Sequence, residues 1–250
     1  MKLGLAGRSV LVTGATGGIG SAVARAYADA GARVAVAFHS AEEPAEALAA
    51  ELGGGAFAVR YALDDPDSIG ESLERVEGEC GGIDVLVAAA VRLGGRRPGP
   101  GSFAATTMPE LAGFIDDNLS ATIRTTQLAC AGMRSRGWGR VVLVSSHLVR
   151  DGRPGMEFYG AAKAGLHGFA RSLMWDVGPD GVLVNVVAPG VTLTPRVTAR
   201  QPAAVIAQEA ARTASGRLAT VEDVANTILF LGSAANGNIT GEVVTVSGGR

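Results

Sequence analysis

A tyrosine and a lysine stand four residues apart in the segment FYGAAKAG, residues 158–165. Residues i and i+4 of a helix share one face, so Tyr159 and Lys163 become neighbours if this segment is helical. An ammonium close to a phenol favours the phenolate and lowers the phenol pKa from its reference value of about 10. The pair is therefore suited to general acid or base chemistry.

The lysine itself is unusual in this chain. Only Lys2 and Lys163 are lysines among the 22 basic residues, and the others are arginines. Because an ammonium and a guanidinium differ in shape, donor geometry and pKa, lysine at position 163 indicates a role that arginine cannot fill. The structural alternative is a buried tyrosine beside a lysine that extends along an apolar surface towards solvent.

Length and composition limit the classes of protein. The chain has 250 residues, of which 47% are hydrophobic and 18% charged, as in a soluble protein with a substantial core. Its net charge of -2 provides no field for unspecific binding of nucleic acid or membranes. No apolar run suits a membrane span or a signal peptide, and Cys80 and Cys130 lack metal-ligand spacing. We expect a cytoplasmic protein with reduced thiols and no metal.

Short β-branched runs alternate with alanine-rich segments of helical period. Predicted strands cover residues 9–14, 33–38, 56–61, 84–91, 140–146, 182–189 and 242–249, and predicted helices cover 19–30, 41–52, 66–79, 108–135 and 157–177. Buried strands separated by helices indicate βαβ units. We therefore expect one α/β domain over residues 1–250, with a doubly wound parallel sheet of about seven strands and helices on both faces.

The first strand is followed by a glycine turn, TGATGGIG, in which Gly14, Gly18 and Gly20 lead into the first helix. Glycines let the backbone approach a pyrophosphate closely, and the helix N-terminus supplies free N–H groups and a positive dipole. This context predicts the dinucleotide-binding turn of a Rossmann fold. The spacing is G-x-x-x-G-x-G, which differs from the commoner G-x-G-x-x-G.

With this glycine spacing, the Tyr-x-x-x-Lys pair and a serine 13 residues before the tyrosine, the sequence resembles the short-chain dehydrogenase/reductase family. It looks most like the ketoreductase branch, which includes β-ketoacyl carrier-protein reductases and polyketide ketoreductases, and the resemblance runs from about residue 6 to the C-terminus. The resemblance implies a catalytic set of Ser146, Tyr159 and Lys163, with Asn118 of IDDNLSAT as a fourth member.

The resemblance also implies a nicotinamide cofactor. APGVTLT matches the segment that approaches the nicotinamide in this family. The implied cofactor contacts are Gly14, Thr16, Gly17, Gly18, Ile19, Gly20, His39, Ser40, Ala62, Leu63, Ala89, Ala90, Tyr159, Lys163, Pro189, Gly190, Thr192 and Thr194.

Carbonyl reduction needs a hydride donor, a proton and a group that polarises the C=O bond. The resemblance implies that Ser146 hydrogen-bonds the substrate oxygen and that Tyr159 donates the proton as general acid. Lys163 would also bind the nicotinamide ribose, and Asn118 would hold a water that links Lys163 to solvent. The expected reaction is the reduction of a β-ketoacyl or polyketide-like ketone to a secondary alcohol.

Several positions depart from the family pattern. Ala88, Ala89, Ala90 and Val91 replace the usual Asn-Asn-Ala-Gly, while Ala62 and Ser247 replace the usual aspartates. Side-chain amides that brace the cofactor shelf are therefore missing. Two alternatives stay open: an NAD-dependent alcohol dehydrogenase that works oxidatively, and a cofactor-binding subunit without catalysis. The complete catalytic set argues against the silent subunit.

The end of the second strand bears on the choice of cofactor. An acidic residue there would accept the adenosine ribose hydroxyls and reject a 2′-phosphate. Here Phe38, His39 and Ser40 occupy these positions, and the first carboxylate along the chain is Glu42. We expect NADPH to be favoured over NADH, although Gly17 stands where NADP-preferring relatives often carry arginine. Phe38 is the position at which we expect an introduced aspartate to favour NADH.

The residues that border the substrate also bear on partners. We expect the loop 92–105 and a lid at about 191–214 to lie at the substrate side. The loop arginines on that side are Arg92, Arg96, Arg97, Arg150 and Arg153. Guanidinium groups suit carboxylates and phosphates, so the carbonyl substrate could be anionic or carrier-tethered; solvated loop charges are the alternative. The helix 157–177 is apolar nearly all round, which predicts a homotetramer or homodimer.

Overall fold

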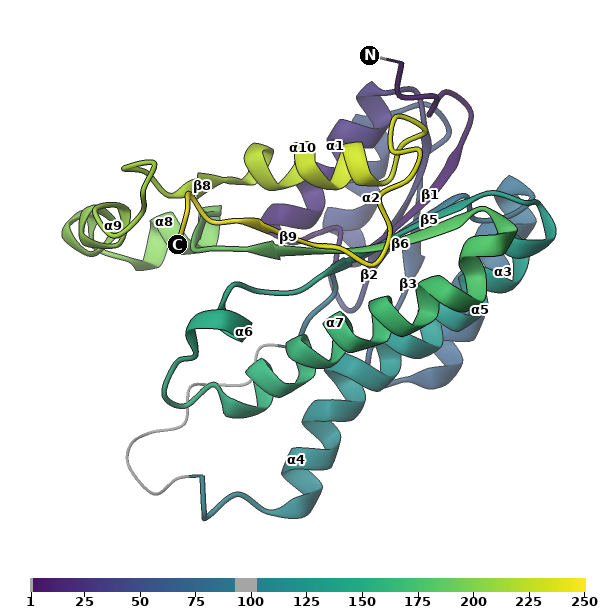
Figure 1. The fold of residues 1–250 in the computed structure, drawn as a ribbon. Helices are drawn as coiled ribbons and strands as arrows, with labels where there is room; N and C mark the ends of the chain where they lie inside the picture. Colours follow the sequence, from purple (N-terminus) through teal and green to yellow (C-terminus); the bar gives the residue numbers. More distant parts are fainter. Residues whose placement is uncertain (1, 93–102) are drawn as a thin grey trace.

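The protein is described by a computed structural model that covers residues 2–92 and 103–250 (Figure 1). Within them, seven parallel strands form one sheet in the order β3-β2-β1-β4-β5-β6-β9. The strands are β1 Ser9–Thr13, β2 Arg33–Phe38, β3 Phe57–Arg60, β4 Val85–Ala88, β5 Gly139–Val144, β6 Val182–Pro189 and β9 Val243–Val246. The doubly wound α/β fold is thereby confirmed. Its strand order reverses between β1 and β4, where open α/β sheets bind ligands.

Helices cover both faces of the sheet, as expected (Figure 1). One face packs against α1 Gly18–Asp29, α2 Glu42–Leu52 and α10 Val221–Leu231, and the other against α3 Pro66–Cys80, α5 Ala121–Ser135 and α7 Glu157–Val177. The two faces form two apolar clusters, because alternate residues of each buried strand point to opposite sides. The sheet is therefore a rigid support for the loops at its carboxyl edge.

The helix predicted over 108–135 is interrupted. It consists of α4 Met108–Ile115, a π-helical turn at Asp116–Ser120 and α5. The side-chain amide of Asn118 donates to the carbonyl oxygen of Phe114, which would accept the backbone N–H of residue 118 in a regular α-helix. This competition explains the extra residue in the turn, and such turns are frequent at functional sites.

The segment between β6 and β9 contains elements that the strand and helix patterns missed. They are β7 Thr192–Leu193, α8 Pro195–Arg200, α9 Ala203–Ala210, β8 Ala219–Thr220 and α10. Neither α8 nor α9 has a buried residue, so both helices lie on the surface of the molecule and outside its core. Two shorter elements, α6 Leu148–Asp151 and a 3₁₀ turn at Gly178–Asp180, were also not predicted. Among the described residues, no helix has the length and apolarity of a membrane span.

Candidate active site

A cavity of about 1050 Å³ opens at the carboxyl ends of the strands on either side of the switch point. The sequence-predicted residues that line it are Gly14, Thr16, Gly17, Gly18, Ile19, Gly20, His39, Leu63, Ala89, Ala90, Ser146, Tyr159, Lys163, Pro189, Gly190, Thr192 and Thr194. Ser40, Ala62 and Asn118 are not among the residues that line it. The cavity thus brings together a glycine turn and a serine–tyrosine–lysine group from distant parts of the chain.

The glycine turn at the start of α1 leaves no room for side chains. Gly14 has a φ of 67°, which favours glycine. A Cβ at Gly20 would lie 2.2 Å from the carbonyl oxygen of Gly14, and one at Gly18 would lie 2.8 Å from the Cβ of Thr194. The bare backbone and the N-terminus of α1 therefore face the cavity, an arrangement that fits the pyrophosphate of a dinucleotide.

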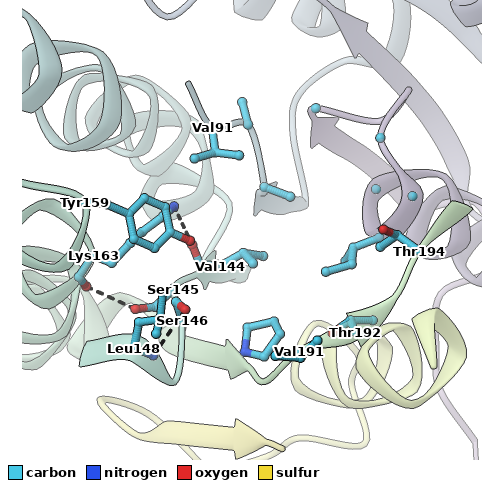
Figure 2. A pocket seen from close by; sticks show the side chains of 18 of the residues that line it. Val91, Val144, Ser145, Ser146, Leu148, Tyr159, Lys163, Val191, Thr192 and Thr194 are labelled. Carbon is cyan, nitrogen blue, oxygen red and sulfur yellow. Dashed lines mark hydrogen bonds between the residues drawn. The ribbon is translucent and has the colours of Figure 1, made fainter. Parts of the chain in front are cut away.

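On the opposite side of the cavity, Tyr159 and Lys163 project from α7 towards the end of β5 (Figure 2). The Nζ of Lys163 donates a hydrogen bond of 2.8 Å to the carbonyl oxygen of Val144. Ser146 follows the strand, and its Oγ accepts a hydrogen bond of 3.2 Å from the backbone N–H of Leu148. The three predicted catalytic side chains therefore meet where α7 crosses the end of the strand.

Burial changes the acidity of both α7 groups. The side chain of Lys163 is buried, and the loss of solvation lowers its pKa to about 8. Burial raises the pKa of Tyr159, while a hydrogen bond with Ser146 acts in the opposite direction. The expectation that this pKa is lowered is therefore wrong, because desolvation raises the pKa of the phenol by more than the hydrogen bond with Ser146 lowers it.

Asn118 lies 1% exposed in the π-helical turn. Its Oδ1 accepts a hydrogen bond of 2.9 Å from the backbone N–H of Arg92, and its Nδ2 donates one of 3.0 Å to the carbonyl oxygen of Phe114. The side chain thus holds the loop that follows β4 against the helix. The predicted role of Asn118 in holding a relay water stays a prediction.

Ala89, Ala90 and Val91, which follow β4 and form the shelf of the cavity, are held in place by side chains from other segments. The Oγ1 of Thr13 accepts hydrogen bonds of 3.1 Å from the backbone N–H groups of both Ala89 and Ala90. Val91 faces the cavity and is 38% exposed (Figure 2). The threonine and Asn118 therefore position a shelf that carries no side-chain amides of its own. The spacing of these residues in sequence gave no signal of either contact.

The end of the cavity beside β2 and β3 contains a carboxylate that the strand-end pattern missed. His39 follows β2 with its side chain 65% exposed, and its Nε2 lies 3.8 Å from the Oδ1 of Asp64. Asp64 follows β3, which pairs with β2, so the carboxyl ends of the two strands are adjacent. Phe38 is 7% exposed and packs in the core, whereas His39 lines the cavity; the effect of an aspartate at position 38 stays a prediction.

Charged side chains gather at the mouth of the cavity. Arg250 contacts Glu209 on α9, and its Nε lies 3.4 Å from the Oδ2 of Asp151 on α6. Arg92 pairs with the buried Asp117. Further arginines that line the cavity are Arg153, Arg196 and Arg212. Arg96, Arg97 and most of the loop 92–105 lie outside the described residues, while Arg150 contacts Asp151 at 3.3 Å.

Candidate metal ligands do not cluster in the described parts of the chain. No three His, Cys, Asp or Glu side chains there lie close enough together to hold a metal ion. Cys80 and Cys130 are free thiols.

The family and the relatives that match this chain are described as reductases or dehydrogenases. The family described as enoyl-(acyl carrier protein) reductase matches residues 14–250. The 3-oxoacyl-[acyl-carrier-protein] reductase FabG of Escherichia coli is 35% identical over 246 residues, or 97% of both chains. The cis-4-hydroxycyclohexanecarboxylate dehydrogenase of Sinomonas cyclohexanicum is 37% identical over 244 residues, or 97% of this chain and 96% of the relative. A solved 7α-hydroxysteroid dehydrogenase, complexed with NADH and 7-oxo glycochenodeoxycholic acid, superposes with a TM-score of 0.90 at 29% identity and covers 99% of this chain and 96% of that one.

Proposed function

Because the chain belongs to the short-chain dehydrogenase/reductase family of NAD(P)-dependent oxidoreductases, we propose that it is an NADPH-dependent ketoreductase. The proposed substrate is a β-ketoacyl or polyketide-like ketone, which is reduced to a secondary alcohol. One observation carries the proposal: Ser146, Tyr159 and Lys163 meet in the cavity whose other side is the glycine turn. A silent subunit would have no use for that arrangement.

The proposed mechanism assigns one task to each side chain. Bound NADPH supplies the hydride. Ser146 hydrogen-bonds the carbonyl oxygen of the substrate and polarises it, and Tyr159 gives that oxygen its proton. Burial raises the pKa of this phenol, so the ring carries its proton at neutral pH and has it available for transfer, while the higher pKa makes it a weaker acid. Lys163, with a pKa of about 8, can return a proton to the tyrosine.

Residues that line the cavity can bind successive parts of the cofactor. The backbone N–H groups at the start of α1 would bind the pyrophosphate, and Lys163 would bind the nicotinamide ribose. Pro189, Gly190 and Thr194 also line the cavity. Loss of NADPH absorbance with a panel of ketones and β-ketoacyl thioesters tests the function. Turnover of at least one member supports it, and tight NADPH binding without any turnover would favour the silent subunit.

The preference for NADPH can be tested at His39, the exposed residue at the end of β2. We expect the wild type to have a higher kcat/KM with NADPH than with NADH, because no carboxylate stands at the end of β2 itself; Asp64, which follows β3 and contacts His39, acts against this preference. His39→Asp should lower the NADPH/NADH ratio of kcat/KM at least about tenfold, because two like charges a few ångströms apart near a protein surface repel by more than about 1.4 kcal/mol. His39→Asn is the neutral control, and Kd values from fluorescence titration supply a second readout. A wild type that prefers NADH would reject this assignment.

The proposed homotetramer or homodimer rests on α7. Leu166 is fully buried against the sheet, Phe169, Leu173 and Met174 are half-buried, and Trp175 is 77% exposed. A large apolar side chain on the outer face of a helix fits burial against another subunit. We expect light scattering at micromolar concentration to give two or four times the mass of one chain. The mass of a single chain would contradict the proposal.

A second candidate function is the oxidation of a hydroxyl group on a carboxylate-bearing molecule with NAD. The arginines at the mouth of the cavity favour it, since guanidinium groups bind carboxylates. The similarity to a dehydrogenase of a hydroxycyclohexanecarboxylate points the same way. The same arginines suit an anionic or carrier-tethered ketone. Comparing 4-oxocyclohexanecarboxylate with cyclohexanone, and NADPH consumption with NAD reduction, separates these possibilities.

A further inference from the structure

Ser145, the residue before the proposed catalytic serine, is buried with its side chain against α7 (Figure 2). Its Oγ lies 3.1 Å from the carbonyl oxygen of Lys163 and 2.8 Å from the Nε2 of His167. A carbonyl oxygen only accepts, so Ser145 donates its single hydroxyl proton in the hydrogen bond to the carbonyl oxygen of Lys163. The Nε2 of His167 must then carry a proton and donate it to Ser145.

The histidine is suited to this task in its neutral form. Burial, and then the charge of Arg171 one turn further along α7, lower the pKa of His167 from its ordinary value. At neutral pH the ring therefore has one proton, and the hydrogen bond to Ser145 fixes it on Nε2. The proton is assigned from the geometry of the three partners.

Three consecutive contacts now join the end of β5 to one turn of α7. Lys163 donates from its Nζ to Val144, Ser145 donates to the carbonyl oxygen of Lys163, and His167 donates to Ser145. Ser145 and Ser146 directly follow β5, so fixing Ser145 against the helix also fixes the backbone from which Ser146 reaches the cavity. The spacing of Ser146 from the α7 side chains is therefore set by this connection.

We propose that His167 is a positioning residue, which acts through Ser145 to hold the catalytic serine and lysine at their working separation. The inference rests on the proposed ketoreductase function. Misplacing a reacting group by about 1 Å can cost on the order of 10²-fold in rate, so removal of the connection should lower kcat much more than binding.

The test compares kcat, the KM of a ketone and the Kd of NADPH in matched variants. His167→Leu and Ser145→Ala should each lower kcat at least about tenfold, within the loss expected for a misplaced reacting group. Ketone KM and NADPH Kd should change less than about threefold, since the lost contact lies behind the reacting groups. His167→Gln should recover most of kcat, because its amide N–H can donate to Ser145.

Two controls separate positioning from stability. Ser72→Ala removes a buried serine hydroxyl on α3 that donates to Ile69 at 2.8 Å, and kcat should not change. The double variant Ser145→Ala/His167→Leu should be no slower than Ser145→Ala, because the two residues act through one connection. Full kcat in a folded His167→Leu, or equal losses in the leucine and glutamine variants, would overturn the inference. A wild type without ketone turnover would instead defeat the proposed function.

Discussion

Tyr159→Phe is expected to lower kcat for ketone reduction by about 10²–10⁴-fold, the usual contribution of general acid catalysis. The substitution removes one oxygen atom and retains the ring, so the packing of α7 around the site is preserved. Ser146 stays in place and can still polarise the carbonyl group. What is lost is the proton donor, and the binding of NADPH should change little.

The pH dependence of the same pair of enzymes provides a second readout. The phenol donates only while it is protonated, so the wild-type rate of reduction should fall as the pH rises through its pKa. Tyr159→Phe should lose that dependence along with the rate. Equal kcat values in the two enzymes, with circular dichroism showing both folded, would remove Tyr159 from the mechanism.

Lys163→Arg should nearly abolish turnover although both side chains are cationic. The Nζ of Lys163 donates to Val144 at 2.8 Å in a place where the lysine is only 3% exposed, and a larger planar guanidinium cannot place its charge and donors at the same point. Burial also lowers the lysine pKa to about 8, which lets it give up a proton near neutral pH. A guanidinium with a pKa above about 12 cannot do so.

The measurement is kcat of Lys163→Arg beside the wild type and Tyr159→Phe, with circular dichroism and NADPH affinity as controls for folding and binding. We expect a loss of at least about 10²-fold, the lower end of an acid/base contribution. A folded arginine variant that keeps more than about a tenth of wild-type kcat would have lost far less activity than expected. Such a result would show that position 163 needs only a positive charge.

Patterns that are local in sequence predicted the fold and the chemical groups. Each strand of the sheet is a short β-branched run, and the glycine turn is recognisable because a strand precedes it and a helix follows it. Tyr159 and Lys163 share a face of α7 by helical geometry alone. These features depend on neighbours along the chain, which a single sequence displays directly.

Features that depend on contacts between distant segments were not predictable in the same way. Asp64 lies close to His39 only because β3 pairs with β2. Thr13 accepts hydrogen bonds from Ala89 and Ala90 only because β4 lies beside β1 in the sheet.

The π-helical turn in the predicted helix 108–135 arises from one side-chain hydrogen bond of Asn118. Helix α10, by contrast, could have been predicted, since Thr220 and Asp223 form a capping box before an apolar run.

The most direct test of the proposed function follows the hydride itself. Wild-type enzyme is incubated with a ketone that it turns over and with NADPH deuterated at the transferable position of the nicotinamide, and the alcohol is analysed by mass spectrometry. The account predicts one deuterium on the carbinol carbon for each NADPH consumed, and no labelled alcohol with Tyr159→Phe on the same timescale. Consumption of NADPH without deuterium in the alcohol, or tight binding of NADPH with no alcohol from any ketone tested, would contradict it.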